Sequence, residues 1–573
     1  MNSLRAMIAQ RFAVSSALIL AAATVLIDAP TGYRLPHDIS SYIYAAQAQS
    51  IHGSGYSAAF INRPPLLLLL LRIWDIMTPS LIGRWHLLHG LCLFLVIYPL
   101  IKIGELFCKS AISIALCALL TTTLYFSGYV DMFLSTEIIG LSFFVSGIWL
   151  LLKSATSQIR FVCALAFCGS SALIREQFLL AVLMVVFYVI VRRKREKGWI
   201  SALRESVLAL AIPILIAVTY LFLSDSLNEY LNILRWSNSR ESSVPTYWFW
   251  DALTASAVAL PILRHSGGNP IVDFLAVRRG DPQSQIFVIV ITLIFLQLAS
   301  SIKRGSISNT TRIGRIDGDR TTSCLFVHKT LVAVAALGLM IGVAHQSQGN
   351  RFNGHYAIAT LIALYLMLLA LLLGPATQHS QTHRITVIII CTITIFPTTT
   401  ALRNLSESMS RLSVEVTLVN LVRPINSVAT AEESYVRVNS SRDNSDCALN
   451  LYGWGLGDFY IYSGVPSCSR YFLSPLIGEG TEAMRFRREL IENPPKWIRL
   501  GCKADECADH SVDEFETLTF PTQKVLDACY TPVASIGQSQ PRFPTLFEPQ
   551  MQSRAELQLC ISSVLEATDL KLD

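Results

Sequence analysis

The sequence predicts a polytopic α-helical membrane protein with a C-terminal α/β domain, and three observations support this fold class. The chain is 52% hydrophobic and 15% charged, whereas soluble domains are typically about 25% charged. Long apolar stretches recur up to residue 400, and Lys and Arg gather in the short segments between them. Beyond that point the apolar stretches end, and six of the thirteen cysteines follow.

The apolar stretches predict about 11 transmembrane helices, because roughly 17 to 25 apolar residues are needed to cross a bilayer. The expected spans are 11–28, 83–101, 110–127, 131–152, 158–174, 176–191, 205–223, 285–301, 329–345, 355–374 and 384–400. The run at 64–78 is short and holds Arg72 and Asp75. It is therefore predicted to be a juxtamembrane or re-entrant helix that does not cross.

The basic residues predict how the chain is threaded, since cytoplasmic loops carry an excess of Lys and Arg. A cytoplasmic N-terminus places every strong basic cluster, including 192–195, on the inner side. The net charge of +6 thus reflects topology and does not indicate a nucleic-acid partner. The predicted transmembrane domain is 1–400, with outer loops 29–82 and 224–284. Residues 401–573 then form an extracytoplasmic domain, in which helix-like 483–492 precedes strand-like 496–500.

The cysteines support this placement of the C-terminal domain. Six of them, Cys447, Cys468, Cys502, Cys507, Cys529 and Cys560, follow residue 401. An even number in one extracytoplasmic domain predicts up to three disulfides, with the connectivity open among fifteen possibilities. A metal site is the alternative, but the Cys502–Cys507 spacing has no convincing second pair.

The segment 34–71 holds the first candidate site residues. Asp38 heads an amphipathic segment that contains Tyr42, and Arg63 precedes two prolines at the start of the next apolar run. Taken alone, Asp38 is typical of a helix N-cap. However, Arg63, Asp131 and Glu137 are predicted on the same side of the membrane. An acid and a guanidinium at the membrane surface indicate a site for a phosphate-linked substrate.

Further candidates lie at the outer ends of later spans, and each has an ordinary alternative. Asp131 is a second candidate acid or a helix cap, and Glu137 is a cavity residue or the structural partner of a buried Arg175. Arg351 is suited to phosphate binding, although a lone Arg is also typical of an interfacial anchor, and His355 lies close to it. The spacing of the histidines does not predict a metal site. The outer loop 224–284 is a candidate acceptor-binding or lid segment.

Taken in order, these features resemble a known superfamily. They are a first span, an outer loop headed by an acid with a Tyr- and Ala-rich helix, an Arg-Pro-Pro-Leu unit, a second acid and a late Arg. This layout resembles the GT-C superfamily of polyprenyl-phosphate-sugar-dependent glycosyltransferases, and most closely its bacterial aminoarabinose-transferase-like and protein O-mannosyltransferase-like branches. Ile39 stands where the family often has Glu, and Phe352 where it usually has Tyr.

The resemblance implies a GT-C-like fold in a bacterial inner (plasma) membrane. It implies that Asp38 is the catalytic base, that Asp131 is a second acid near the same cavity, and that Arg63 and Arg351 bind the donor phosphate. Tyr42, Glu137, Arg175 and His355 are further candidates for that cavity. The implied partners are a polyprenyl-phosphate sugar, an acceptor that is a glycan, lipid or protein, and membrane lipids. No cofactor is specified, and a divalent metal is compatible with the pattern.

Two other classes of protein remain as alternatives. A transporter or flippase of lipid-linked glycans has charges near the bilayer midplane and paired half-helices, whereas the acids here are expected at the outer ends of spans. A non-catalytic envelope scaffold leaves Asp38 and Arg63 without a role.

Overall fold

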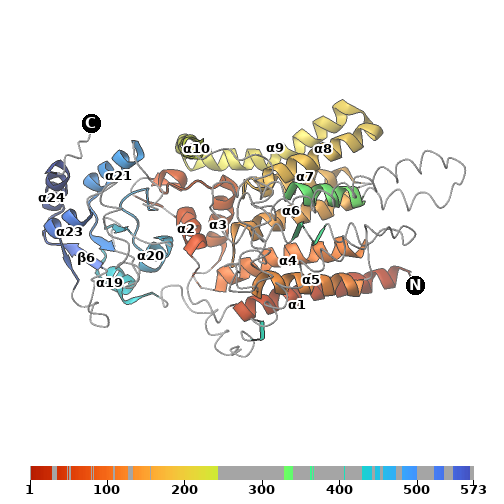
Figure 1. The fold of residues 1–573 in the computed structure, drawn as a ribbon, viewed down its shortest axis with the longest axis horizontal. Helices are drawn as coiled ribbons and strands as arrows, with labels where there is room; N and C mark the ends of the chain where they lie inside the picture. The colour runs from red at the N-terminus through yellow and green to blue at the C-terminus, as the bar shows by residue number, and fades with distance from the viewer. Residues whose placement is uncertain are drawn as a thin grey trace, which may run out of the picture. The chain divides into compact units, whose positions relative to one another are not determined.

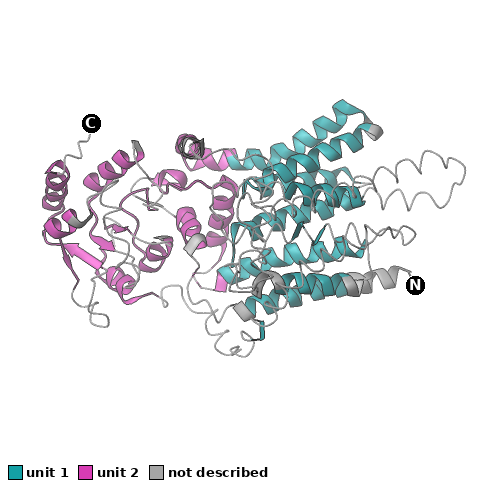
Figure 2. Cartoon of the chain, in the orientation of Figure 1, with its two compact units in different colours: residues 1–31, 85–217, 240–418 teal, residues 32–84, 218–239, 419–573 magenta. Residues whose placement is uncertain are grey.

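The computed structural model describes a mostly helical chain (Figure 1). The described residues are 2–28, 35, 37–47, 49–50, 53–78, 81, 83–106, 110–126, 133–154, 157–242, 328–339, 362–363, 365–366, 405–406, 429–441, 446–451, 456–472, 481–499, 522–533 and 546–567. Contacts divide the chain into two compact units, coloured in Figure 2. Unit 1 is Met1–Thr31, Trp85–Ala217 and Arg240–Leu418, and unit 2 is Gly32–Arg84, Val218–Ser239 and Val419–Asp573.

This division differs from the consecutive domains 1–400 and 401–573 that we predicted from hydropathy. Unit 2 joins the first predicted outer loop, the beginning of the second predicted outer loop and most of the C-terminal part. Residues that are far apart in the sequence therefore share one compact body, and Asp38 belongs to the same unit as the C-terminal cysteines.

Unit 1 is built from apolar helices. They are α1 (Asn2–Asp28), α4 (Gly83–Glu105), α5 (Ser110–Phe126), α6 (Thr136–Lys153), α7 (Gln158–Ala172), α8 (Phe178–Lys197) and α9 (Trp199–Leu223), with α4 beginning and α9 ending in unit 2. Among the described residues, α4, α6 and α9 are long and apolar enough to cross a membrane. Shorter apolar helices are Arg11–Leu26, Ser113–Thr122, Gln158–Ala172 and His328–Leu339. The chain is thus a multi-pass membrane protein.

The predicted spans can be compared with these helices where the chain is described. The spans 83–101, 110–127 and 205–223 lie on α4, α5 and α9. The span expected at 131–152 begins later, at Thr136, because Ser135 caps α6 by accepting a hydrogen bond from the Ile138 amide. The spans 285–301 and 384–400 lie outside the described residues, so the total of about 11 stays a prediction.

Small residues allow close packing in unit 1. A Cβ on Gly147 of α6 would lie 2.5 Å from the Cys168 Sγ and 2.8 Å from the Ala164 carbonyl oxygen of α7. A Cβ on Gly140 would lie 2.4 Å from the Phe178 ring at the start of α8. Small residues at helix contacts let backbones approach closely inside membranes, so α6 is fixed against both neighbours.

The first part of unit 2 comes from the two segments that we predicted as outer loops. It contains α2 (His37–Gln47), β1 (Gln49–Ser50), β2 (Gly53–Ser54), the 3₁₀ turn η1 (Gly55–Ser57), α3 (Pro65–Met77) and the beginning of α10 (Leu227–Ser242). The thirteen residues of α3 span about 20 Å, which is less than the roughly 30 Å of the hydrocarbon core. Its length agrees with the prediction that 64–78 does not cross.

The second part of unit 2 is a mixed sheet with surrounding helices. Its elements are α19 (Ala431–Asn439), β3 (Ala448–Asn450), α20 (Leu456–Ser463), α21 (Thr481–Glu492), β4 (Trp497–Arg499), α23 (Thr522–Cys529), β5 (Tyr530–Pro532), β6 (Leu546–Pro549) and α24 (Arg554–Ala567). The strand order is β3-β4-β6-β5, with β3 parallel to β4 and the other pairs antiparallel. The helix expected at 483–492 is α21, and the strand expected at 496–500 is β4.

Four of the six C-terminal cysteines form disulfides. Cys447 pairs with Cys468 beside β3, and Cys529 at the end of α23 pairs with Cys560 on α24. The disulfide prediction is confirmed for these four cysteines. The metal alternative is wrong for them, because their sulfur atoms are bonded to each other in pairs. Cys502 and Cys507 lie outside the described residues.

Candidate functional site

The candidate residues fall into three groups in the structure. Asp38, Tyr42 and Arg63 belong to unit 2, whereas Glu137 and Arg175 belong to unit 1. The third group, Asp131, Arg351 and His355, lies outside the described residues, so their proximity to a shared cavity stays a prediction. The described residues therefore provide two local arrangements, one in each unit.

The helix that carries Asp38 is almost completely enclosed. All residues from Ile39 to Ala46 of α2 are buried, including Ser40 and Ser41. The segment was expected to be amphipathic, and the structure shows instead that both of its faces are covered, as in a core helix. The helix begins at His37, so Asp38 is its second residue.

Arg63 is held against α2 through Tyr42. The Arg63 Nε donates to the Tyr42 Oη at 3.0 Å, and the guanidinium carbon lies 5.2 Å from the centre of the Tyr42 ring. The Tyr56 hydroxyl donates to the Arg63 carbonyl oxygen, which fixes the backbone before the two prolines. Pro64 then caps α3 and Pro65 begins it, a position that tolerates proline because the first helical amide has no intrahelical partner.

The position of Tyr42 relative to Asp38 matters for this arrangement. Residues four apart on a helix are neighbours on its surface, so positions 38 and 42 share one face of α2. The guanidinium of Arg63 therefore lies against the helix face that contains position 38. In this geometry the Arg63 guanidinium, a group suited to phosphate binding, lies near the helix turn that contains position 38.

The second arrangement is a buried ion pair in unit 1. The Arg175 Nε lies 3.0 Å from the Glu137 Oε1, and both side chains are at most 2% exposed. Thr136 donates to the other Glu137 oxygen at 3.2 Å, and the Arg175 Nη1 lies 3.3 Å from Glu176. The sequence alternative in which Glu137 is the structural partner of Arg175 matches this geometry. A cavity role for either residue stays a prediction.

Sequence reasoning missed two buried polar residues near this pair. The His89 Nδ1 of α4 accepts a hydrogen bond from the Leu134 amide at 2.9 Å, and Leu134 has a left-handed φ of 49°. This bond fixes the turn before α6. Gln177, which is 3% exposed, has no hydrogen-bond partner for either amide atom among the described residues. The sequence signal for Gln177 is the polar run Arg175-Glu176-Gln177, from which only Arg175 was predicted to have a role.

The described residues contain no group of three His, Cys, Asp or Glu side chains that could hold a metal ion. His355, as a candidate near Arg351, falls outside that part of the chain. The described site is therefore composed of an acid position on α2, a tyrosine and an arginine.

Comparison with known proteins gives only distant similarities. No family model matches the sequence, and no curated protein matches it. Among solved structures, the archaeal oligosaccharyltransferase AglB from Archaeoglobus fulgidus, in complex with an inhibitory peptide and a dolichol-phosphate, has a TM-score of 0.43 at 11% identity. That match covers 97% of this chain and 77% of AglB. A second Archaeoglobus fulgidus oligosaccharyltransferase structure, tethered to an acceptor peptide, has a TM-score of 0.39 at 12% identity, with 85% and 68% coverage.

Proposed function

We propose that this chain is a membrane glycosyltransferase of the GT-C type. It moves a monosaccharide from a polyprenyl-phosphate carrier to an acceptor hydroxyl at the extracytoplasmic face of a bacterial inner membrane. The observation that carries the proposal is the Arg63 guanidinium, held by Tyr42 against the face of α2 that contains position 38.

The proposed chemistry is a single displacement at C1 of the sugar. The acceptor oxygen attacks C1 opposite the phosphate, and Asp38 takes the acceptor proton as general base, which contributes about 10²–10⁴-fold. The bond between C1 and the phosphate oxygen breaks, and the polyprenyl phosphate leaves with the electron pair. Arg63 stabilises the negative charge that develops on that oxygen. The configuration at C1 is therefore inverted, and no covalent enzyme intermediate forms.

The extracytoplasmic location is supported by the disulfides of unit 2, because disulfides form and persist in oxidising compartments. Asp38 belongs to the same unit as both disulfides. Asp131 and Arg351 are proposed from the sequence as the second acid and the second phosphate ligand, with Glu137, Arg175 and His355 as candidates near that cavity.

The test is transfer from a radiolabelled polyprenyl-phosphate hexose to lipid, glycan and peptide fractions of the cell envelope by the purified protein. Asp38→Asn should abolish transfer while the protein still inserts and binds donor, and Arg63→Ala should raise the donor KM. Asp225→Asn is the matched control, because Asp225 lies in unit 2 with a left-handed φ of 49° that Asn also tolerates. Full transfer by Asp38→Asn would refute the catalytic role. Movement of intact donor across a bilayer without transfer would favour the flippase alternative.

A further inference from the structure

Helix α2 is in close backbone contact with α20 of the C-terminal part. A Cβ on Gly457 would lie 2.5 Å from the Ser41 Cα and 2.6 Å from the Ser40 carbonyl oxygen. These contacts are with backbone atoms, which cannot rotate away as a side chain can. Only glycine is accommodated at this position with α2 in its present place, and Ser41 is one helical turn after Asp38.

Tyr44 joins α2 to the segment that follows α20. Its hydroxyl accepts a hydrogen bond from the Ser467 amide at 2.9 Å. Its ring centre lies 4.8 Å from that of Tyr460 on α20 and 4.8 Å from that of Phe472. Aromatic pairs at such distances add stabilisation beyond the area they bury, so Tyr44 fixes the rotation of α2 as well as its position.

Helix α20 and the segment that follows it also hold the chain on either side of α2. The Tyr462 hydroxyl accepts a hydrogen bond from the Leu35 amide at 2.8 Å, before the helix begins. After the helix, the Phe60 amide donates to the Arg470 carbonyl oxygen at 2.8 Å, and the Phe60 ring packs on Tyr471. The chain that carries positions 38, 42 and 63 is thus attached to this segment at several points.

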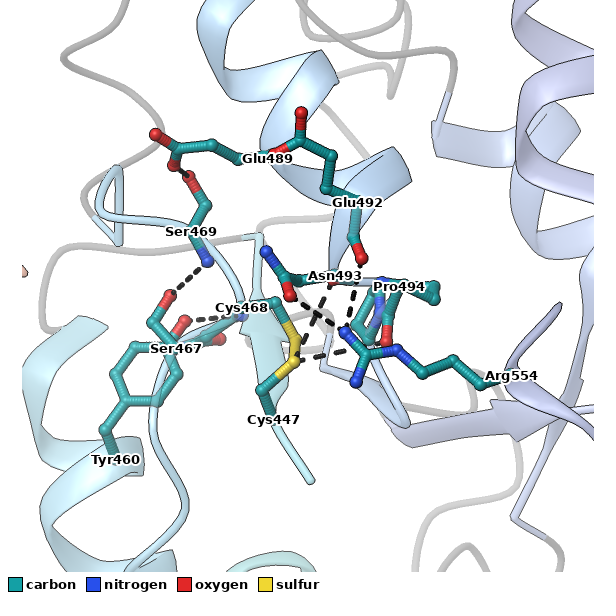
Figure 3. Close-up of a disulfide and its surroundings, with 12 residues drawn as sticks. Cys447, Tyr460, Ser467, Cys468, Ser469, Glu489, Glu492, Asn493, Pro494 and Arg554 are labelled. Atoms are coloured by element: carbon teal, nitrogen blue, oxygen red, sulfur yellow. Dashed lines mark hydrogen bonds between the residues drawn. A yellow bond between two sulfur atoms is a disulfide. The ribbon is translucent and has the colours of Figure 1, made fainter. Parts of the chain in front are cut away.

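The supporting segment is residues 466–472, and it is itself fixed from two sides (Figure 3). On one side Cys468 is bonded to Cys447, and its amide donates to the Ala448 carbonyl oxygen of β3 at 3.0 Å. On the other side Glu489 of α21 accepts hydrogen bonds from the Ser469 hydroxyl at 2.7 Å and from the Arg470 amide and Nε at 3.0 Å and 2.6 Å. The segment cannot shift without breaking these bonds.

We propose that the C-terminal part positions the catalytic helix: Gly457 and Tyr44 are positioning residues for α2, and the Cys447–Cys468 disulfide maintains the segment on which α2 rests. This inference rests on the proposed function for its consequence in catalysis, while the attachment of α2 has a separate readout. None of these residues touches the reacting atoms.

The first test replaces Gly457 by Val. Ordinary contacts of 3.4–4 Å require α2 and α20 to separate by about 1 Å, and a displacement of that size can cost about 10²-fold in rate. We expect the kcat for transfer from a radiolabelled polyprenyl-phosphate hexose to fall by about that factor, with a smaller change in KM. Gly464→Ala is the control for backbone strain alone, because the φ of 72° after α20 strains any residue with a side chain, whereas a Cβ added there would meet nothing within 4 Å.

The second readout is amide hydrogen exchange of residues 39–46, which does not depend on any activity. Gly457→Val should raise exchange in α2 at least tenfold, and Gly464→Ala should not. Unchanged exchange in Gly457→Val would overturn the proposal, whatever Asp38→Asn shows. Raised exchange with an unchanged kcat would overturn the positioning role. If Asp38→Asn retains transfer while exchange rises as expected, the proposed function fails and the attachment of α2 stands.

A matched pair of disulfide variants keeps the proposal testable if Gly457→Val does not fold. The two disulfides close loops with similar sequence separations, 21 and 31 residues, so their effects on the unfolded chain are similar. Removal of the Cys447–Cys468 bond by serine substitution should raise exchange in residues 39–46 and lower kcat. Removal of the Cys529–Cys560 bond should leave both unchanged. Equal effects of the two variants would overturn the proposal.

Discussion

Replacing Glu137 by Gln removes the buried anion that faces Arg175. The Arg175 side chain is 2% exposed and cannot reach water, and its second acidic partner, Glu176, is 44% exposed. Removing one member of a buried pair leaves an uncompensated charge and typically costs about 3–5 kcal/mol. We expect a loss of this size for Glu137→Gln. Arg175→Met should cost a similar amount, because Glu137 then loses its cation and the Thr136 hydroxyl is a weaker, neutral donor.

The double variant Glu137→Leu with Arg175→Met, compared with the single variants Glu137→Leu and Arg175→Met, is the informative one. It removes both charges together and fills the space with apolar groups, a change that is often neutral or stabilising for buried pairs. We expect its free energy of unfolding to return to within about 1 kcal/mol of the wild type, which gives a coupling energy of several kcal/mol in the double-mutant cycle. The assay is denaturant unfolding of the purified protein in detergent.

The cycle also separates the two interpretations of Glu137. Losses that simply add in the double variant would refute the reasoning, since an uncoupled pair is not the structural unit that the 3.0 Å contact indicates. Sugar transfer by the restored double variant would assign the pair a purely structural role. Stability that returns without transfer would retain Glu137 as a cavity residue.

Three further predictions concern single contacts. Tyr44→Phe should destabilise unit 2 by about 1–3 kcal/mol, because it leaves the buried Ser467 amide without its acceptor; a thermal midpoint equal to wild type would contradict this. Gly147→Leu should cost about 1–3 kcal/mol by forcing α6 from Cys168 of α7, measured against Cys163→Leu at an exposed position of α7. Burial raises the pKa of Tyr460 to about 12 from 10.0, so the folded state favours the protonated hydroxyl. The free energy of unfolding that this preference contributes is fully present below pH 10 and is lost as the pH rises to 12. At about 1.4 kcal/mol per pH unit, this loss is roughly 3 kcal/mol. A difference in tyrosinate absorbance between the wild type and Tyr460→Phe that rises at pH 10 without unfolding would contradict it.

The regular part of the fold could be predicted because its signals are local. Apolar runs of sufficient length predicted α4, α5 and α9, and the crowding of cysteines after residue 401 predicted disulfides. The pairing of Cys447 with Cys468 could not be predicted, because it depends on β3 and on the segment that returns beside it. Helix α6 begins later than its apolar run because a local cap, Ser135, determines where the helix can start.

The candidate site was predictable in residue type but not in its surroundings. Tyr42 and Arg63 stand out in the sequence, yet nothing local indicates that Ser40 and Ser41 are buried. These two serines are the polar residues of the amphipathic pattern in α2. In the structure the backbone at Gly457 packs directly against them. Tyr44 and its partner Ser467 are 423 residues apart. A pattern read within one helix cannot detect a partner at that separation.

This separation has a consequence for how the proposed site forms. An eleven-residue helix is marginal in water without tertiary contacts, so α2 depends on such contacts, including the hydrogen bond of Tyr44 to the segment 466–472. That segment is synthesised after all the predicted spans and depends on an oxidised Cys447–Cys468 pair. We therefore expect insertion of the spans first, then oxidation and folding of the C-terminal part, and docking of α2 last. A chain that has inserted but has not formed this disulfide should therefore carry Asp38 on a segment that has not yet docked in the position proposed for catalysis.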